Sequence, residues 1–129
     1  MALDKRNISI FALCIYLALI CILCFIRPSD FPDTPLELWG IAIDKIVHFL
    51  MFAPFPILAY FALSAKTKYI ILIFIAGCIF SLGTEYIQGL TDYRSFEWKD
   101  LAADTLGLLS GSALTLIHST LKNKRNNDK

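Results

Sequence analysis

Charge is scarce in this sequence and is gathered into short clusters. Charged side chains make up 18% of its 129 residues, and 12 Lys and Arg against 11 Asp and Glu leave a net charge of +1. No basic stripe with interleaved aromatic residues is present, so the sequence gives no support for nucleic-acid binding. The near balance of charge likewise gives no reason to expect a strongly acidic partner.

Cysteine is sparse, and its spacing excludes the common uses of paired thiols. All four cysteines lie inside apolar runs: Cys14, Cys21, Cys24 and Cys78. Cys21 and Cys24 have the Cys-x-x-Cys spacing of redox and metal motifs, but neither a second ligand pair nor a βαβ pattern accompanies them. We interpret the cysteines as small apolar side chains of a membrane protein.

Long apolar runs are abundant instead. Hydrophobic residues make up 57% of the chain and the mean hydropathy is +0.61, above the apolar share of about 45–50% in soluble domains. Four runs, at about residues 8–26, 44–63, 69–90 and 101–117, approach the roughly 20 residues that cross a bilayer as a helix. The predicted fold class is therefore all-α, an integral membrane bundle of four transmembrane helices.

The first run, residues 8–26, can be a membrane span or the apolar part of a signal peptide. As a helix its nineteen residues would extend about 28 Å, close to the roughly 30 Å hydrocarbon core of a bilayer. Signal-peptide cores usually have about 7–15 residues and end at a small-residue cleavage site. This run is longer and closes on Arg27 and Pro28, so we predict an uncleaved span.

Basic residues predict how the bundle lies in the membrane. Eight of them belong to the N-terminus, the loop between the second and third runs, and the C-terminus: Lys5, Arg6, Lys66, Lys68, Lys122, Lys124, Arg125 and Lys129. Four belong to the opposite side: Arg27, Lys45, Arg94 and Lys99. The positive-inside rule then places both termini in the cytoplasm. We predict a bacterial cytoplasmic-membrane protein with one domain over residues 1–121 and a disordered basic cytoplasmic tail at 122–129.

Proline marks two interruptions of helix. The loop over residues 28–43 carries three prolines, which block a continuous helix, and Trp39, which suits the membrane interface. Pro54 and Pro56 fall inside the second run, where they predict a kink that neighbouring groups must stabilise.

Polar and ionisable side chains enter three of the predicted spans near one end. They come from those spans and from one loop: Asp44, Lys45, His48, Glu85, Gln88, Arg94, Asp100 and Asp104. Such groups are costly in a bilayer and mark functional sites by default. Because the predicted orientation brings all of them to the outer face, we expect one polar pocket that opens there.

The fourth run also carries a stripe of small residues, Ala103, Gly107 and Gly111. Spacing of this kind lets a neighbouring helix approach closely. We interpret the stripe as packing within the bundle, and as the interface if the protein forms a homo-oligomer.

Together the polar segments resemble the VanZ-like family of small membrane proteins. The segments are Asp-Lys-Ile-Val-His at 44–48, Glu-Tyr-Ile-Gln at 85–88, Arg94, and Asp-Leu-Ala-Ala-Asp-Thr-Leu-Gly-Leu-Leu-Ser-Gly at 100–111. Asp104 stands where much of the family has Asn. The resemblance implies a small membrane bundle and a link to resistance against the lipoglycopeptide teicoplanin, and it implies no established reaction.

Three functions fit such a pocket, and binding is the one we prefer. The ligand would be a lipid headgroup, a lipid-linked cell-envelope precursor or an amphiphilic glycopeptide-type antibiotic, and the other expected partners are membrane lipids. The predicted substrate-binding residues are Asp44, Lys45, Gln88, Arg94 and Asp100.

The second function is an enzyme that modifies or hydrolyses a lipid-linked envelope substrate. His48, Glu85 and Asp104 would then be catalytic by acid–base chemistry, and Arg94 would hold a phosphate. No serine or cysteine nucleophile with a local base stands out, and Ser81 is interpreted as a small packing residue.

A metal site is a variant of the enzyme interpretation, and a purely structural cluster is the third interpretation. His48 with Glu85, Asp44 and Asp104 could bind a divalent metal, but the spacing matches no zinc signature, so we predict neither a metal nor a cofactor. In a structural cluster Glu85 would pair with Lys45 or Arg94, and Asp104 with His48 or Gln88, to fix helix register.

Overall fold

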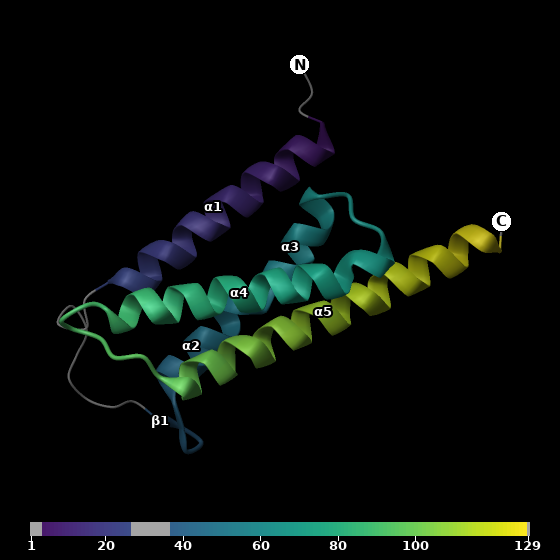
Figure 1. Cartoon of the computed structure of the whole chain (residues 1–129). Helices are drawn as coiled ribbons and strands as arrows, with labels where there is room; N and C mark the ends of the chain where they lie inside the picture. The colour runs from purple at the N-terminus through teal and green to yellow at the C-terminus, as the bar shows by residue number, and fades with distance from the viewer. Residues whose placement is uncertain (1–3, 27–36, 129) are drawn as a thin grey trace.

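The computed structural model describes residues 4–26 and 37–128, which fold as a helical bundle with a small hairpin at one end (Figure 1). The elements in chain order are α1 (Lys5–Phe25), β1 (Glu37–Leu38), β2 (Ile41–Ala42), α2 (Ile43–Phe52), α3 (Pro54–Ala62), the 3-10 turn η2 (Thr67–Tyr69), α4 (Ile70–Gly89) and α5 (Trp98–Asn127). The hairpin and the α4–α5 loop lie at one end of the bundle, and the chain termini lie toward the other.

Four helices are long and apolar enough to cross a membrane, which confirms the predicted fold class. They are Lys5–Phe25, Ile43–Ala62 (α2 with α3), Thr67–Gly89 and Trp98–Asn127. Large apolar side chains such as Phe11, Ile79 and Leu114 face outward along them. Apolar surface this extensive is what lipid covers in a multi-pass membrane protein.

The second span is broken, as its prolines predict. Helix α2 ends at Phe52 and α3 begins at Pro54, because proline has no N–H to continue the hydrogen-bond ladder. The Tyr16 hydroxyl of α1 donates a hydrogen bond to the Met51 carbonyl beside the break. A side chain from a neighbouring helix thus binds backbone at membrane depth, where water is absent.

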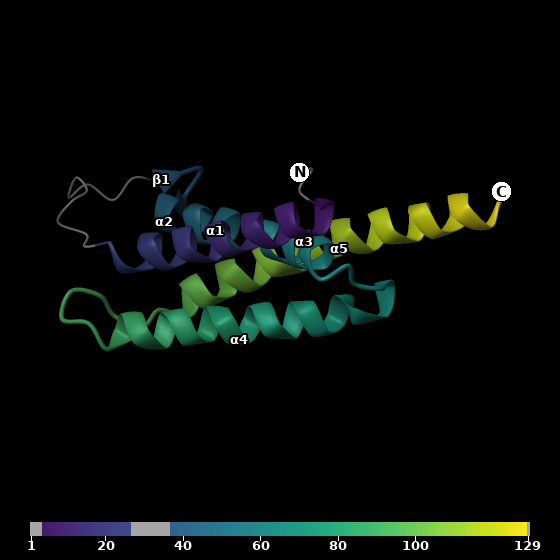
Figure 2. The same ribbon diagram turned by 90° about the horizontal axis from the view of Figure 1, so that it is seen from above.

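Helix α5 lies against this break and packs on α2 and α3 on one side and on α4 on the other (Figure 2). A Cβ atom added to Gly107 would overlap the Phe49 carbonyl, and one added to Gly111 would overlap the Ala53 carbonyl. The small-residue stripe is therefore an intramolecular packing surface. Homo-oligomerisation stays a prediction, and this stripe is not the face available for it.

The loop before α2 and the end of α5 contain more regular structure than the sequence predicts. Residues 27–36, which include the predicted proline-rich segment and Arg27, lie outside the described residues. After them β1 and β2 form an antiparallel hairpin whose turn residues Trp39 and Gly40 have φ of 54° and 76°. Positive φ at both positions is the pattern of a tight type I′ turn.

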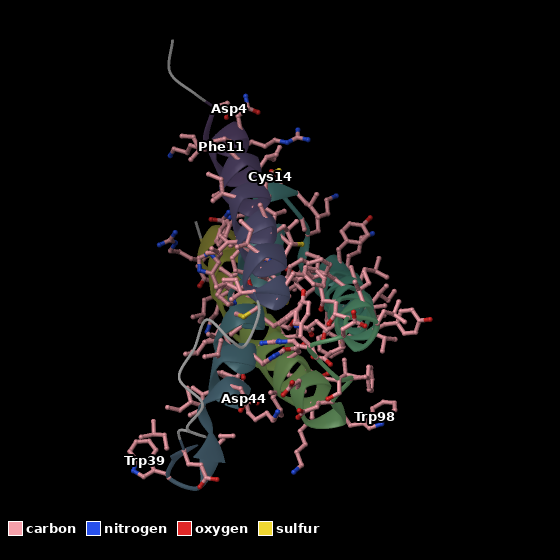
Figure 3. The ribbon with its side chains drawn as sticks, turned by 90° about the vertical axis from the view of Figure 1, so that its left-hand side faces the viewer. Asp4, Phe11, Cys14, Trp39, Asp44 and Trp98 are labelled. Atoms are coloured by element: carbon pink, nitrogen blue, oxygen red, sulfur yellow. The ribbon has the colours of Figure 1, made fainter. Side chains whose placement is uncertain are left out.

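Two tryptophans mark the hairpin end of the molecule. Trp39 is 93% exposed and Trp98 is 74% exposed. Viewed from this end they project outward on either side of Asp44 (Figure 3). Exposed indole rings at the end of a transmembrane bundle are typical of the membrane interface.

The expectation of a disordered tail from residue 122 is wrong, because α5 continues to Asn127. Lys124 and Arg125 lie in its last turn, where positive charge interacts favourably with the helix dipole. Asn123 donates a hydrogen bond to the Thr67 hydroxyl at 3.2 Å, and Tyr60 donates one to the Ser119 hydroxyl at 3.1 Å. These contacts stabilise the helix beyond its apolar part.

Gly111→Ala should lower the free energy of unfolding by about 1–3 kcal/mol, the usual effect of overpacking a close contact. The matched control is Gly83→Ala on α4, where no atom lies within 4 Å of an added Cβ. Reversible unfolding in mixed detergent micelles measures both variants. Equal stability of the two would contradict the close approach of α5 to the break.

Candidate functional site

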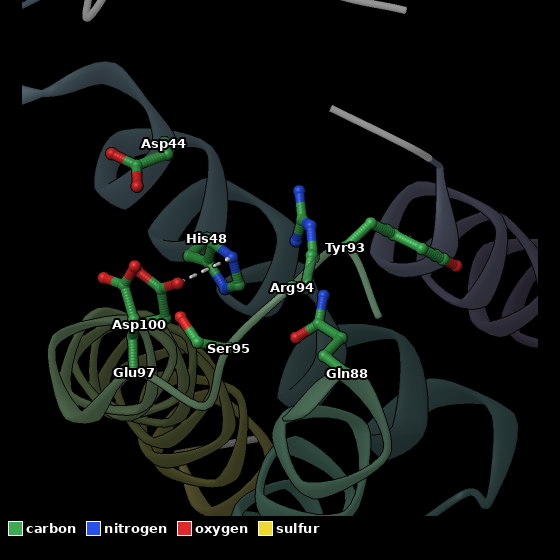
Figure 4. Close-up of a pocket in the computed structure, with 8 residues that line it drawn as sticks. All are labelled: Asp44, His48, Gln88, Tyr93, Arg94, Ser95, Glu97 and Asp100. Carbon is green, nitrogen blue, oxygen red and sulfur yellow. Dashed lines mark ion pairs between the residues drawn. The ribbon is translucent and has the colours of Figure 1, made fainter. Parts of the chain in front are cut away.

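A polar pocket of about 230 Å³ opens at the hairpin end of the bundle. Its walls come from α2, the end of α4, the α4–α5 loop and the start of α5 (Figure 4). The lining residues are Asp44, His48, Gln88, Tyr93, Arg94, Ser95, Glu97 and Asp100. The structure thus brings five of the predicted site residues to one cavity, and Lys45, Glu85 and Asp104 are not among its lining residues.

Lys45 pairs with three carboxylates at the rim of the pocket. Its Nζ atom lies 2.8 Å from Asp44 Oδ2 and 2.7 Å from Glu97 Oε2, and it also pairs with Asp100 Oδ1. The lysine side chain is 15% exposed, so it points into the site. One partly buried ammonium group therefore connects the start of α2 to the start of α5.

His48 and Asp104 form a buried pair beneath this rim. His48 is 6% exposed and Asp104 is fully buried, and His48 Nδ1 lies 2.9 Å from Asp104 Oδ1. The other oxygen of Asp104 accepts a hydrogen bond of 2.7 Å from the Ser81 hydroxyl. With both oxygens bound, Asp104 fixes the orientation of the imidazole ring.

Ser81 is more than the packing residue that the sequence suggested. Its hydroxyl comes from α4 and completes a Ser81–Asp104–His48 chain across three helices. The signal for it was its position one helical turn before Glu85, on the same face of α4. Buried hydrogen-bond chains of this kind make a site rigid.

Glu85 contributes a buried carboxylate from α4. It is 1% exposed, and its Oε2 atom accepts a hydrogen bond of 3.2 Å from the backbone N–H of Glu97. It pairs with neither Lys45 nor Arg94 in the part of the chain that the structure describes. Of the pairings expected for a structural cluster, the structure contains the one between Asp104 and His48.

Gln88 and Tyr93 hold α1 against the site. Gln88 Nε2 donates a 2.7 Å hydrogen bond to the Cys24 carbonyl, and the Tyr93 hydroxyl donates one of 3.3 Å to the Phe25 carbonyl. The last carbonyls of a helix lack partners within that helix, and these two side chains supply them. Gln88 therefore has a structural role besides lining the cavity.

Arg94 is the cationic side chain of the pocket with no ion pair or hydrogen bond among residues 4–26 and 37–128. It lies in the α4–α5 loop, and its side chain extends beside His48 in the close-up view. An arginine that lines a cavity without a protein partner is available to an anion.

Three lining residues were missed by sequence reasoning: Tyr93, Ser95 and Glu97. All lie in the loop before α5, where helical periodicity gives no guide to direction. Glu97 is also the residue that precedes α5, so the turn into the helix places its carboxylate near Lys45.

Fold and site together define a multi-pass membrane protein with a polar pocket at one end of its bundle. Residues 11–119 match the VanZ/LLP1 family, and the chain belongs to this family. A protein of Schizosaccharomyces pombe described as uncharacterized is 32% identical over 88 residues, covering 67% of this chain and 52% of the yeast protein. The chain thus spans about half the length of this curated relative. No solved structure matches the chain.

The effects of His48→Gln and Asp104→Asn on the free energy of unfolding should not be additive, because each substitution leaves the other group buried without its partner. We expect a coupling energy of about 0.5–3 kcal/mol from a double-mutant cycle measured by reversible unfolding in micelles. The control cycle combines Asp104→Asn with His118→Gln, since His118 lies far along α5. That pair should be additive within about 0.5 kcal/mol, and additivity of the first pair would contradict the buried contact.

Proposed function

We propose that the protein binds an amphiphile with an anionic headgroup in the pocket, with its apolar part remaining in the surrounding lipid. The ligands of this class are a phospholipid, a lipid-linked envelope precursor and a lipid-tailed glycopeptide antibiotic. The observation that carries the proposal is Arg94, a pocket cation without a partner among the described residues.

The chemistry of Arg94 selects the headgroup. A guanidinium group presents a planar fork of donors that matches phosphate or carboxylate oxygens in pairs. The carboxylates on the opposite wall already share Lys45, so they do not need Arg94. An incoming anion therefore meets a free cation at the side of the cavity formed by the α4–α5 loop.

Among these ligands we favour a phospholipid headgroup. The related protein comes from a fission yeast, which has phospholipids but no bacterial peptidoglycan precursors, so phosphate on a lipid is the chemistry that both proteins encounter. The location we propose for this chain is a bacterial cytoplasmic membrane, with the pocket at the outer face and both termini in the cytoplasm.

Arg94→Gln should weaken binding of short-chain phosphatidic acid to the delipidated protein by about tenfold or more, because a charge-assisted phosphate contact contributes about 1.5–3 kcal/mol. Lys99→Gln is the control, since it removes an exposed cation at the start of α5 outside the lining. Native mass spectrometry measures both variants, with short-chain diacylglycerol as the phosphate-free ligand.

If the Arg94 and Lys99 variants lose equal affinity for phosphatidic acid, the effect comes from the overall charge of the protein, and the proposal is contradicted. Binding of diacylglycerol as tight as that of phosphatidic acid would contradict it as well. Teicoplanin in the same titration separates the antibiotic from the lipid: only a ligand whose affinity depends on Arg94 occupies this pocket.

The His48–Asp104 pair favours a second candidate, an enzyme acting on the bound lipid. A histidine oriented by a buried carboxylate through Nδ1 presents Nε2 for proton transfer, the arrangement used by many general bases. Mass analysis of the lipid recovered after incubation separates the candidates. Unchanged lipid indicates binding, and a changed headgroup that requires His48 indicates catalysis.

The outward orientation of the pocket is open to a direct test in a cysteine-free variant. A membrane-impermeant thiol reagent applied to intact cells should label Asp92→Cys in the α4–α5 loop and not Lys66→Cys in the α3–α4 loop. Both positions are exposed, so reactivity reports the side of the membrane. The reverse labelling would show that the pocket faces the cytoplasm.

A further inference from the structure

The carboxylates in and around the pocket outnumber the cations that face them. Five lie on α2, on α4, on α5 and just before α5: Asp44, Glu85, Glu97, Asp100 and Asp104. Within the described ranges, Lys45 is the lysine or arginine that forms ion pairs with this group. Uncompensated negative charge is costly in the low-dielectric interior of a membrane bundle, so further positive charge is required.

The acidic residues of the site fall into two groups, and, in the part of the chain that is described, a lysine ammonium group lies within only the first of them. Asp44, Glu97 and Asp100 face one another at the rim, and the ammonium group of Lys45 pairs with all three. His48, Glu85 and Asp100 also converge, each offering a ligand atom within 4.8 Å of the others. Among the described residues, no lysine or arginine pairs with the Glu85 side of this second group.

The second group keeps polar atoms that make no hydrogen bond among the described residues. His48 Nε2 lies 3.6 Å from Asp100 Oδ2, too far for a hydrogen bond. Glu85 binds a backbone N–H through Oε2, and its other oxygen has no hydrogen-bond partner among the described residues. His48 and Glu85 are 6% and 1% exposed, so bulk water does not solvate them fully.

In a neutral imidazole, the His48–Asp104 contact favours the tautomer in which Nε2 is an acceptor. When Nδ1 donates its proton to Asp104, Nε2 carries a lone pair near Asp100, and Glu85 offers an oxygen to the same group. Three converging acceptors repel one another, and a bound cation or a proton relieves that repulsion. A histidine whose far nitrogen is bound by a carboxylate is also the arrangement that orients metal-binding histidines.

We propose that His48, Glu85 and Asp100 bind a divalent first-row metal ion, with Asp104 and Ser81 positioning the histidine. One imidazole with two carboxylates suits Zn²⁺ or Mn²⁺. Ligand atoms at about 2.1 Å from a common ion lie about 3–4 Å apart, and the three ligand atoms here already lie within 4.8 Å of one another.

Such an ion would lie beside the same cavity as Arg94, because His48 and Asp100 line it. It supplies a second positive charge for a phosphate headgroup. The metal site goes beyond the proposed lipid binding and is independent of it, since none of its ligands is Arg94. Arg94→Gln should therefore keep the metal while it loses the lipid, which separates failure of one proposal from failure of the other.

The test measures metal content of the full chain in micelles, after chelation and re-addition of Zn²⁺ or Mn²⁺. Wild type and Asp92→Asn, an exposed acid outside the pocket lining, should each hold about one ion per chain. Asp104→Asn should weaken binding about 10- to 100-fold, as loss of a ligand-orienting partner does. Glu85→Gln and Asp100→Asn should reduce it further, with helix content by circular dichroism checking that each variant is folded.

A second measurement needs no variant. Pulsed paramagnetic resonance on the Mn²⁺-loaded wild type should show coupling to a single histidine nitrogen. Absence of that coupling would overturn the proposal, and so would a folded wild type that holds no more Zn²⁺ or Mn²⁺ than Glu85→Gln. In that case a proton on His48 Nε2 supplies the missing charge.

Discussion

The close approach of α5 to the broken second span is the contact on which the rest of the structure depends. Gly107 and Gly111 allow it, because any side chain there would overlap the Phe49 and Ala53 carbonyls. Asp104 and Asp100 lie on the same face of α5, one and two turns nearer the hairpin end. The contact that brings the backbones together thus also brings these acids against α2.

Helix α4 combines a close-packed glycine with polar site residues on one face, as α5 does. A Cβ added to Gly77 would press on Leu108 and Phe55, so this end of α4 packs closely on apolar neighbours. Further along the same face Ser81 and Glu85 enter the polar site. On both α4 and α5, the small residues pack against neighbouring helices, and the polar residues toward the hairpin end of the same face form the site.

Hydrogen bonding explains why so polar a site is compatible with a membrane bundle. Asp104 is fully buried but bound at both oxygens by His48 and Ser81. Pairing is incomplete at two places. Arg94 is a cation without a partner among the described residues, and the group around His48 Nε2 has an excess of carboxylates. An anionic headgroup and a cation are the complements of these two places.

The sequence by itself predicted the membrane class, the four spans, the break near Pro54 and the residues that meet at one end, because span length, proline and buried charge are strongly constrained in a bilayer. Only the tertiary structure decided the partners. Glu97 rather than Glu85 faces Lys45, Ser81 binds Asp104, and Gln88 binds α1. Helical periodicity fixes the face on which a residue lies, whereas pairing across helices depends on their rotation and separation, which packing against the glycines sets.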